Sequence, residues 1–148
     1  YETAILIHLD TIKFSPNYFL AYYHLTLTYL LSNQTEKAIE TSQIALKLSK
    51  DTSLTDVSSV FLQIARGSQQ KAKEILNNLI KLKENKYVSP VNIASCFAYF
   101  KDKESTLQWL ERGLMEKDPN ITWIKVDKEF EFLRNEPDFC RILKQIDL

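Results

Sequence analysis

Glycine is scarce in this chain. Gly67 and Gly113 are the only two among 148 residues. Dinucleotide fingerprints and phosphate-binding loops need several glycines, because the backbone itself must approach the anion closely. The sequence therefore excludes both kinds of nucleotide site. Scarce glycine, together with only four prolines, also argues against a turn-rich β architecture.

An excess of charge and a long hydrophobic run are also lacking. The 19 basic residues balance 19 acidic ones. A phosphate backbone needs a cationic surface, so we expect no nucleic-acid partner for this domain. No apolar run reaches the roughly 20 residues of a membrane span, so no membrane partner is expected either.

Cysteine is the third scarce residue. Cys96 and Cys140 lie far apart in the chain, which favours two separate thiols over a disulfide and suits a reducing, cytoplasmic compartment. The chain opens on Tyr1, without a Met or a signal-like segment. This predicts that it is a piece of a longer protein.

A period of 34 residues runs through the chain. It relates Ala4, Ala38, Ala72 and Thr106, each near the start of a helix-like stretch. Another helical stretch precedes each of the last three, across a short polar turn that forces antiparallel neighbours. We predict helical hairpins at residues 17–50, 51–86 and 87–117. An unpaired helix in residues 1–16 would be the second helix of a truncated repeat.

The hairpins resemble the tetratricopeptide repeat. The first matches through an aromatic–Leu–small–Tyr pattern followed by two alanines, and the third through a shorter apolar set. The matching residues are Tyr22, Leu25, Thr26, Tyr29, Ala38, Ala45, Ile93, Ala94 and Phe97. The resemblance implies an all-α, α-α superhelix whose first helices line a concave groove.

The last segment, residues 118–148, resembles the closing segment of tetratricopeptide domains in bacterial signalling proteins. These are winged-helix regulators, adenylate cyclases and Ser/Thr kinases. The matching residues are Asp127, Phe130, Leu133, Arg134, Pro137, Phe139 and Leu143. We expect capping helices here, Trp109 and Trp123 packed between the last hairpin and this segment, and a single domain.

The middle hairpin departs from the repeat pattern. In strict register Asp56, Ser59 and Gln63 would be core residues. The apolar stripe lies one residue away, at Leu54, Val57, Val60, Phe61 and Ile64. We infer that this helix is turned by about one residue, which leaves open which of its side chains face the groove.

The resemblance also implies a partner-binding groove. Its predicted residues are Leu20, Tyr23, His24, Leu27, Leu30, Val57, Phe61, Asn92, Ser95 and Tyr99. Exposed apolar surface of this kind marks interaction sites. The alternative is that these side chains are covered as additional core.

The first helix has apolar residues on almost every side, which suits a helix buried all round. We predict that Ile5, Leu6, Leu9 and Ile12 pair with a second copy of the chain in a homodimer. The alternative to this pairing is stacking of the helix in a crystal, and we also predict that a further repeat precedes the helix in a longer parent protein.

Catalytic, cofactor and metal sites are not expected. His8 lies on an apolar helix, where packing is commoner than ligation. His24, Cys96 and Cys140 fall on different hairpins and cannot converge on one metal. We therefore expect a non-enzymatic module that binds a protein or peptide. The alternatives are a homo-oligomerisation domain and a small-ligand sensor with a pocket lined by Tyr99, Trp123 and a buried carboxylate.

Overall fold

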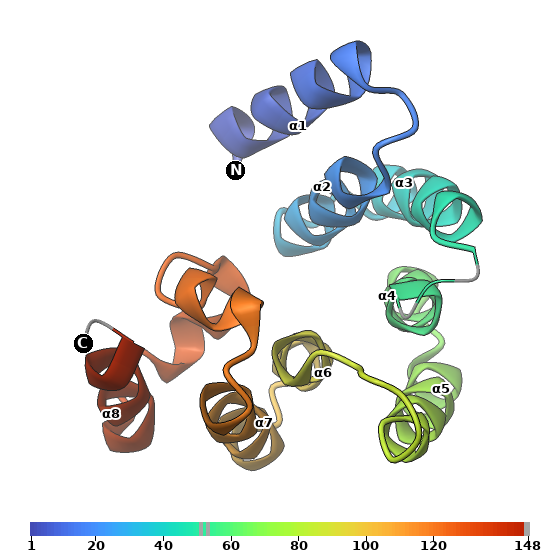
Figure 1. The fold of residues 1–148 in the computed structure, drawn as a ribbon. Coiled ribbons are helices and arrows are strands. Elements are labelled where there is room, and N and C mark those ends of the chain that lie inside the picture. Colours follow the sequence, from blue (N-terminus) through green and yellow to red (C-terminus); the bar gives the residue numbers. More distant parts are fainter. Residues whose placement is uncertain (51, 53, 147–148) are drawn as a thin grey trace. The chain divides into compact units, whose positions relative to one another are not determined.

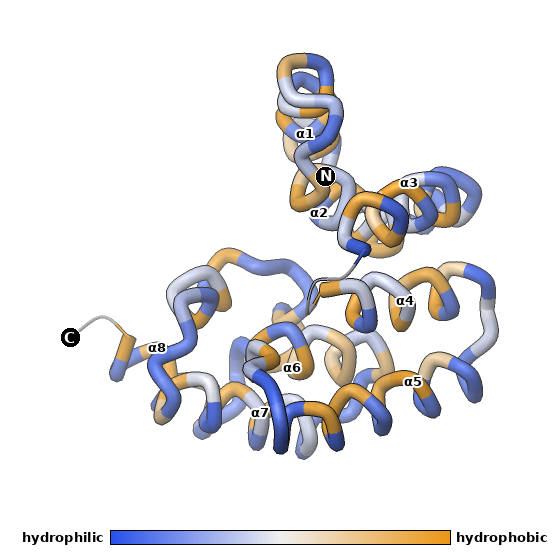
Figure 2. The backbone as a smooth tube through the Cα atoms, turned by 45° about the vertical axis from the view of Figure 1, so that its right-hand side comes forward, coloured by the Kyte–Doolittle hydropathy of each residue, from blue (hydrophilic) through white to orange (hydrophobic). Residues whose placement is uncertain are grey.

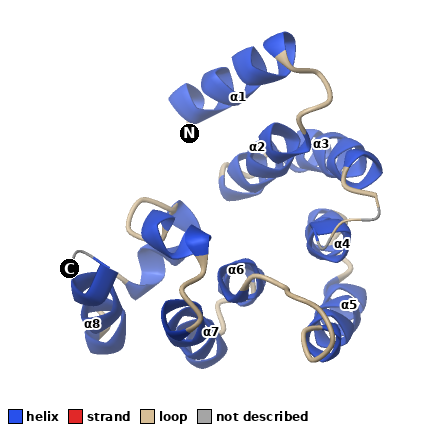
Figure 3. Cartoon of the chain, viewed as in Figure 1, coloured by secondary structure: helices blue, strands red, loops and turns tan. Residues whose placement is uncertain are grey.

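The computed structural model describes residues 1–50, 52 and 54–146, and these residues form helices, turns and loops without a strand (Figure 3). The predicted all-α fold is confirmed. The predicted repeat boundary at residue 51 and the last two residues of the predicted cap, 147 and 148, lie outside the described residues. The chain divides into two compact units, Tyr1–Leu82 and Lys83–Leu148, and each is described by itself.

The first unit contains five helices in its described residues, each packed against the next along the chain (Figure 1). They are α1 (Glu2–Phe14), α2 (Phe19–Leu31), α3 (Thr35–Leu48), α4 (Leu54–Ala65) and α5 (Gln69–Leu82). The pairs α2/α3 and α4/α5 occupy the predicted hairpins, and α1 is the helix without a preceding partner.

The turns inside the hairpins repeat the same backbone motif. Asn33, Gly67 and Lys101 each have a φ between 57° and 73°, and they are 34 residues apart. At the first, the Gln34 N–H donates to the Tyr29 carbonyl at 2.9 Å, and the Asn33 N–H donates to the Leu30 carbonyl at 3.2 Å. The same pair of bonds follows α4 and α6. This is the Schellman motif, in which a left-handed residue lets the chain reverse.

The core of the first unit is built around the small residues of the repeat. Ala38 and Ala72 have no exposed surface. Leu25, Tyr29, Ala38 and Ala65 form one buried cluster. Figure 2 shows the amphipathic pattern clearly on α5, whose Leu76 and Leu79 are buried. Burial of an apolar stripe on each helix is the main term holding such a unit together.

The helix of the middle hairpin follows its apolar stripe. Val57, Val60 and Phe61 have at most 1% of their surface exposed. Gln63 is buried beside them, at 8%. The shifted stripe therefore describes the packing of α4 better than the strict repeat register does.

The second unit pairs two α-helices and covers them with the C-terminal segment. Its elements are α6 (Pro90–Tyr99), α7 (Lys103–Met115), two 3₁₀ helices, η1 (Pro119–Trp123) and η2 (Lys128–Leu133), and α8 (Pro137–Ile146). The segment η1, η2 and α8 packs against α6 and α7. Phe130, Phe139 and Ile142 of this segment are fully buried.

The two tryptophans differ in their surroundings. Trp109 is buried, but 62% of Trp123 is exposed, so the prediction for Trp123 is wrong. Ile121 and Ile124, three residues apart, are the side chains that this turn buries. In a 3₁₀ helix residues at i and i+3 lie above one another, which leaves Trp123 on the outside.

Within the described residues, both cysteines are free thiols. No helix there has the length and apolar character needed to cross a membrane.

Candidate functional site

Four of the predicted groove residues are buried in the first unit. Tyr23, Leu27, Val57 and Phe61 have between 0% and 6% of their surface exposed. The Tyr23 and Phe61 rings meet edge to face, with centroids 5.8 Å apart. These side chains are core and offer no surface to a partner, so the additional-core interpretation describes them.

The remaining predicted positions on α2 are accessible. Leu20 and Leu30 are half-buried, and His24 is exposed. Leu30 packs against the buried cluster of this unit, which leaves Leu20 and His24 as the open edge of the predicted groove.

His24 is the centre of a row of aromatic rings. It stacks on His8 of α1, with centroids 5.8 Å apart and planes inclined by 14°. It also meets Tyr23 edge to face at 5.2 Å. With the Tyr23–Phe61 contact, four rings extend from the surface into the core. The separate positions of His8 and His24 in the sequence gave no sign of this contact.

The environment of the two histidines favours their neutral forms. His24 keeps an exposed edge, but the rings packed on it displace water. This desolvation, with the nearby charge of His8, lowers the pKa of His24 to about 4. Desolvation also lowers the pKa of His8. At neutral pH the pair is therefore an uncharged aromatic surface.

Of the three predicted groove positions in the second unit, one is buried and two are half-buried. Ser95 is buried, and Asn92 and Tyr99 are half-buried. The Ser95 hydroxyl donates to Oε1 of Glu129 at 3.1 Å. Ser95 thus attaches α6 to η2 and offers no surface to a partner.

A buried carboxylate was one feature of the alternative ligand pocket, and Glu129 is 7% exposed. Desolvation raises its pKa, against the effect of hydrogen bonds from its own backbone and from Ser95. Desolvation and the charge of Glu129 raise the pKa of nearby Asp127 to about 7. Trp123, however, points to the surface, so the predicted lining set does not assemble around Glu129.

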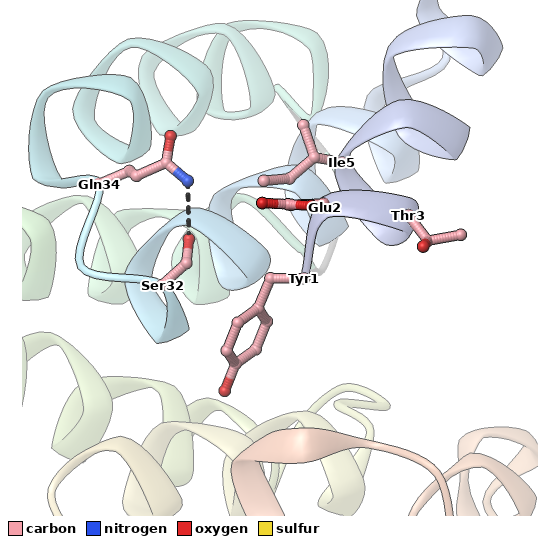
Figure 4. Close-up of a pocket in the computed structure, with 6 residues that line it drawn as sticks. All are labelled: Tyr1, Glu2, Thr3, Ile5, Ser32 and Gln34. Carbon is pink, nitrogen blue, oxygen red and sulfur yellow. Dashed lines mark hydrogen bonds between the residues drawn. The ribbon is translucent and has the colours of Figure 1, made fainter.

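Two hollows on the first unit are lined mostly by polar residues. One lies between the start of α1 and the α2–α3 turn, and the six residues drawn in Figure 4 line it. There Nε2 of Gln34 donates to the Ser32 hydroxyl at 3.1 Å (Figure 4). The other lies along the α4–α5 turn from Gly67 to Glu74. Each hollow contains a single carboxylate, Glu2 or Glu74, and no histidine or cysteine, so neither brings together an acid/base pair.

The described residues contain no cluster of side chains suited to bind a metal ion. In residues 1–50, 52 and 54–146, no set of three or more His, Cys, Asp or Glu side chains is placed to hold an ion. His8 and His24 contact each other as stacked rings.

The outer face of α1 is the most apolar exposed helix surface of the first unit. No residue of this helix is buried within the single chain, so its burial by a second copy or by a further repeat stays a prediction. Ile5 and Ile12 turn inward and pack against the buried cluster. Leu6, Ile7, Leu9 and Phe14 are exposed by 43% to 84%. The predicted self-association set therefore divides into two inward and two outward residues.

Compared with known proteins, the chain matches no protein-family model, and no curated protein is similar to it.

Proposed function

We propose that this chain is a non-enzymatic interaction domain that binds a helical or extended peptide of a protein partner. The observation that carries the proposal is the row of rings His8, His24, Tyr23 and Phe61, open to solvent at His24. An aromatic side chain that already packs against other rings loses little conformational entropy on binding. Such side chains are favoured as interface anchors.

Leu20 supplies the apolar neighbour that such an anchor needs. It lies one turn before His24 on α2 and is half-buried. A peptide with one large apolar side chain would cover Leu20 and stack against His24. Because both histidines are neutral at pH 7, this edge favours an apolar anchor over an acidic one.

The proposal extends to the setting of the domain. The resemblance of residues 118–148 supports a role in a bacterial signalling or transcription-regulatory protein. The two free thiols favour a cytoplasmic location.

A displayed library of amphipathic-helix and extended peptides tests the binding edge. Enriched peptides would be titrated by fluorescence polarisation against the wild type, Leu20→Asp and His24→Asp. The control is Ile44→Asp, an apolar position on α3 that is 41% exposed and lies outside the predicted groove. We expect affinity to fall about tenfold or more for the two α2 variants, with the control unchanged. An equal loss in all three variants, or no enriched peptide, would refute the proposal.

A further inference from the structure

The exposed face of α1 carries a row of four side chains with a symmetric order. At about 100° per residue, Glu2, Leu6, Leu9 and Lys13 lie within an arc of about 60°. All four are exposed. Ile5 and Ile12 lie about 80° around the helix from the middle of this row, and they anchor the helix to its own unit. The row therefore reads acidic, apolar, apolar, basic along the helix and is open to solvent beside the stripe that packs on the core.

This order is complementary to itself when reversed. In an antiparallel pair of such helices related by a two-fold axis, Leu6 lies against Leu9 of the other helix. The same register places Glu2 against Lys13, at both ends of the contact. A two-fold interface requires this kind of self-complementarity, in which residue i meets residue j and j meets i.

We propose that the outer face of α1 binds α1 of a second copy of this chain, antiparallel, with Glu2 of each copy paired to Lys13 of the other. This surface differs from the α2 edge proposed above, so the two proposals can fail separately.

The charges of Glu2 and Lys13 favour a second copy of this chain over a different protein as the partner of the α1 face. Lys13 lies eleven positions after Glu2, or about 16 Å along a helix, which is too far for them to pair within one chain. Among the described residues no ion pair to either is recorded. A reversed copy supplies both missing partners and the apolar centre at once, whereas a parallel copy would place like charges together.

The size of the contact sets the expected strength. A helix of 13 residues is about 20 Å long, so the buried area falls at the small end of specific interfaces. We therefore expect a reversible dimer with a dissociation constant on the order of 10–100 µM.

Sedimentation equilibrium across about 1–500 µM chain tests the proposal, with variants chosen for their signs of charge. Glu2→Lys makes both ends of the row basic, and Lys13→Glu makes both acidic. Each alone should dimerise about tenfold or more weakly than the wild type, since two attractions become two repulsions. An equimolar mixture of the two should recover dimer. The double variant Glu2→Lys/Lys13→Glu should also dimerise, which a parallel arrangement forbids.

Leu6→Asp should abolish the dimer, while Met115→Asp, at an exposed apolar position in the other unit, should not. Circular dichroism of every variant confirms that the helices remain. A wild type that stays monomeric at the highest concentration would overturn the proposal and leave the α1 face to a different partner. Dimerisation that is insensitive to all three α1 substitutions would overturn it as well.

Cross-linking checks the register. In a Cys140→Ser background, a Leu6→Cys chain mixed with a Leu9→Cys chain should form a disulfide-linked pair faster than either chain does alone. Cys96 is fully buried and does not compete. Equal rates for all combinations would contradict the antiparallel register.

Discussion

The imidazole rings of His8 and His24 stack across α1 and α2, with their centroids 5.8 Å apart. Both histidines have pKa values below the usual 6.5, His24 at about 4. The folded state therefore binds fewer protons than the unfolded state at acidic pH. Their effect on stability is absent above about pH 6.5, and stability falls as the pH decreases from there toward 4.

Replacing His24 tests this relationship. His24→Gln should reduce the loss of unfolding free energy between about pH 7 and pH 4.5. We expect a difference of about 1 kcal/mol after discounting for the exposed edge of the ring. Urea denaturation of the wild type and the variant at both pH values measures it. If the free energy of unfolding changed equally with pH in both proteins, the folded state would not lower the pKa of His24.

Asp127 should produce the opposite pH dependence. Desolvation and the charge of Glu129 raise its pKa to about 7. The unfolded chain releases this proton near pH 4, so stability is lost as the pH rises from about 4 to 7. Asp127→Asn should therefore stabilise the protein by about 1 kcal/mol at pH 8 and have little effect at pH 4. Urea unfolding at pH 4 and pH 8 measures this difference. An equal increase in stability at both pH values would indicate that the substitution acts through packing and not through charge.

The hydrogen bond from Ser95 to the buried carboxylate of Glu129 should contribute to the stability of the second unit. Ser95→Ala removes the hydroxyl that donates to Oε1 of Glu129, and both residues are less than 10% exposed. Leaving a buried carboxylate without this donor should cost about 1–3 kcal/mol. Glu129→Gln keeps an acceptor and removes the buried charge, so it should cost less than Ser95→Ala. If Glu129→Gln is the more damaging change, the ionised carboxylate itself stabilises the unit.

The fold could be predicted because it repeats. A 34-residue period and short polar turns indicated antiparallel helix pairs, and left-handed residues follow the same period at Asn33, Gly67 and Lys101. Glycine or asparagine at a helix end signals such a cap. Lysine does not, and Lys101 adopts the conformation because the turn around it requires it.

The candidate site was less predictable, because a helical period identifies a face but not what covers it. Leu20 and Leu27 share the predicted face of α2, yet Leu27 is buried and Leu20 is only half-buried. The His8–His24 stack depends on how α1 crosses α2, which is set by tertiary packing. Ser95 likewise finds Glu129 only because η2 folds back over α6.

Asp118 joins the starts of two helices in the second unit. One of its oxygens, Oδ2, accepts from the Ser89 hydroxyl at 2.5 Å and from the Val91 N–H at 3.0 Å. The other accepts from the Asn120 N–H at 2.9 Å. Only 1% of Asp118 is exposed. The carboxylate thus satisfies free N–H groups in the first turns of both α6 and η1.

Removing this carboxylate should destabilise the unit more than any surface change. Asp118→Ala leaves three donors without an acceptor, two of them in buried hydrogen bonds, and we expect a loss of about 3 kcal/mol or more. Asp118→Asn keeps one acceptor but turns an amide toward donors, so it should cost about 2 kcal/mol. The control Asp138→Ala removes an exposed carboxylate at the start of α8 and should change stability by about 0.5 kcal/mol or less. Urea unfolding monitored by tryptophan fluorescence measures all three. If Asp118→Ala were no worse than Asp138→Ala, the contacts of Asp118 would be dispensable and the apolar packing of η1 alone would hold it on α6 and α7.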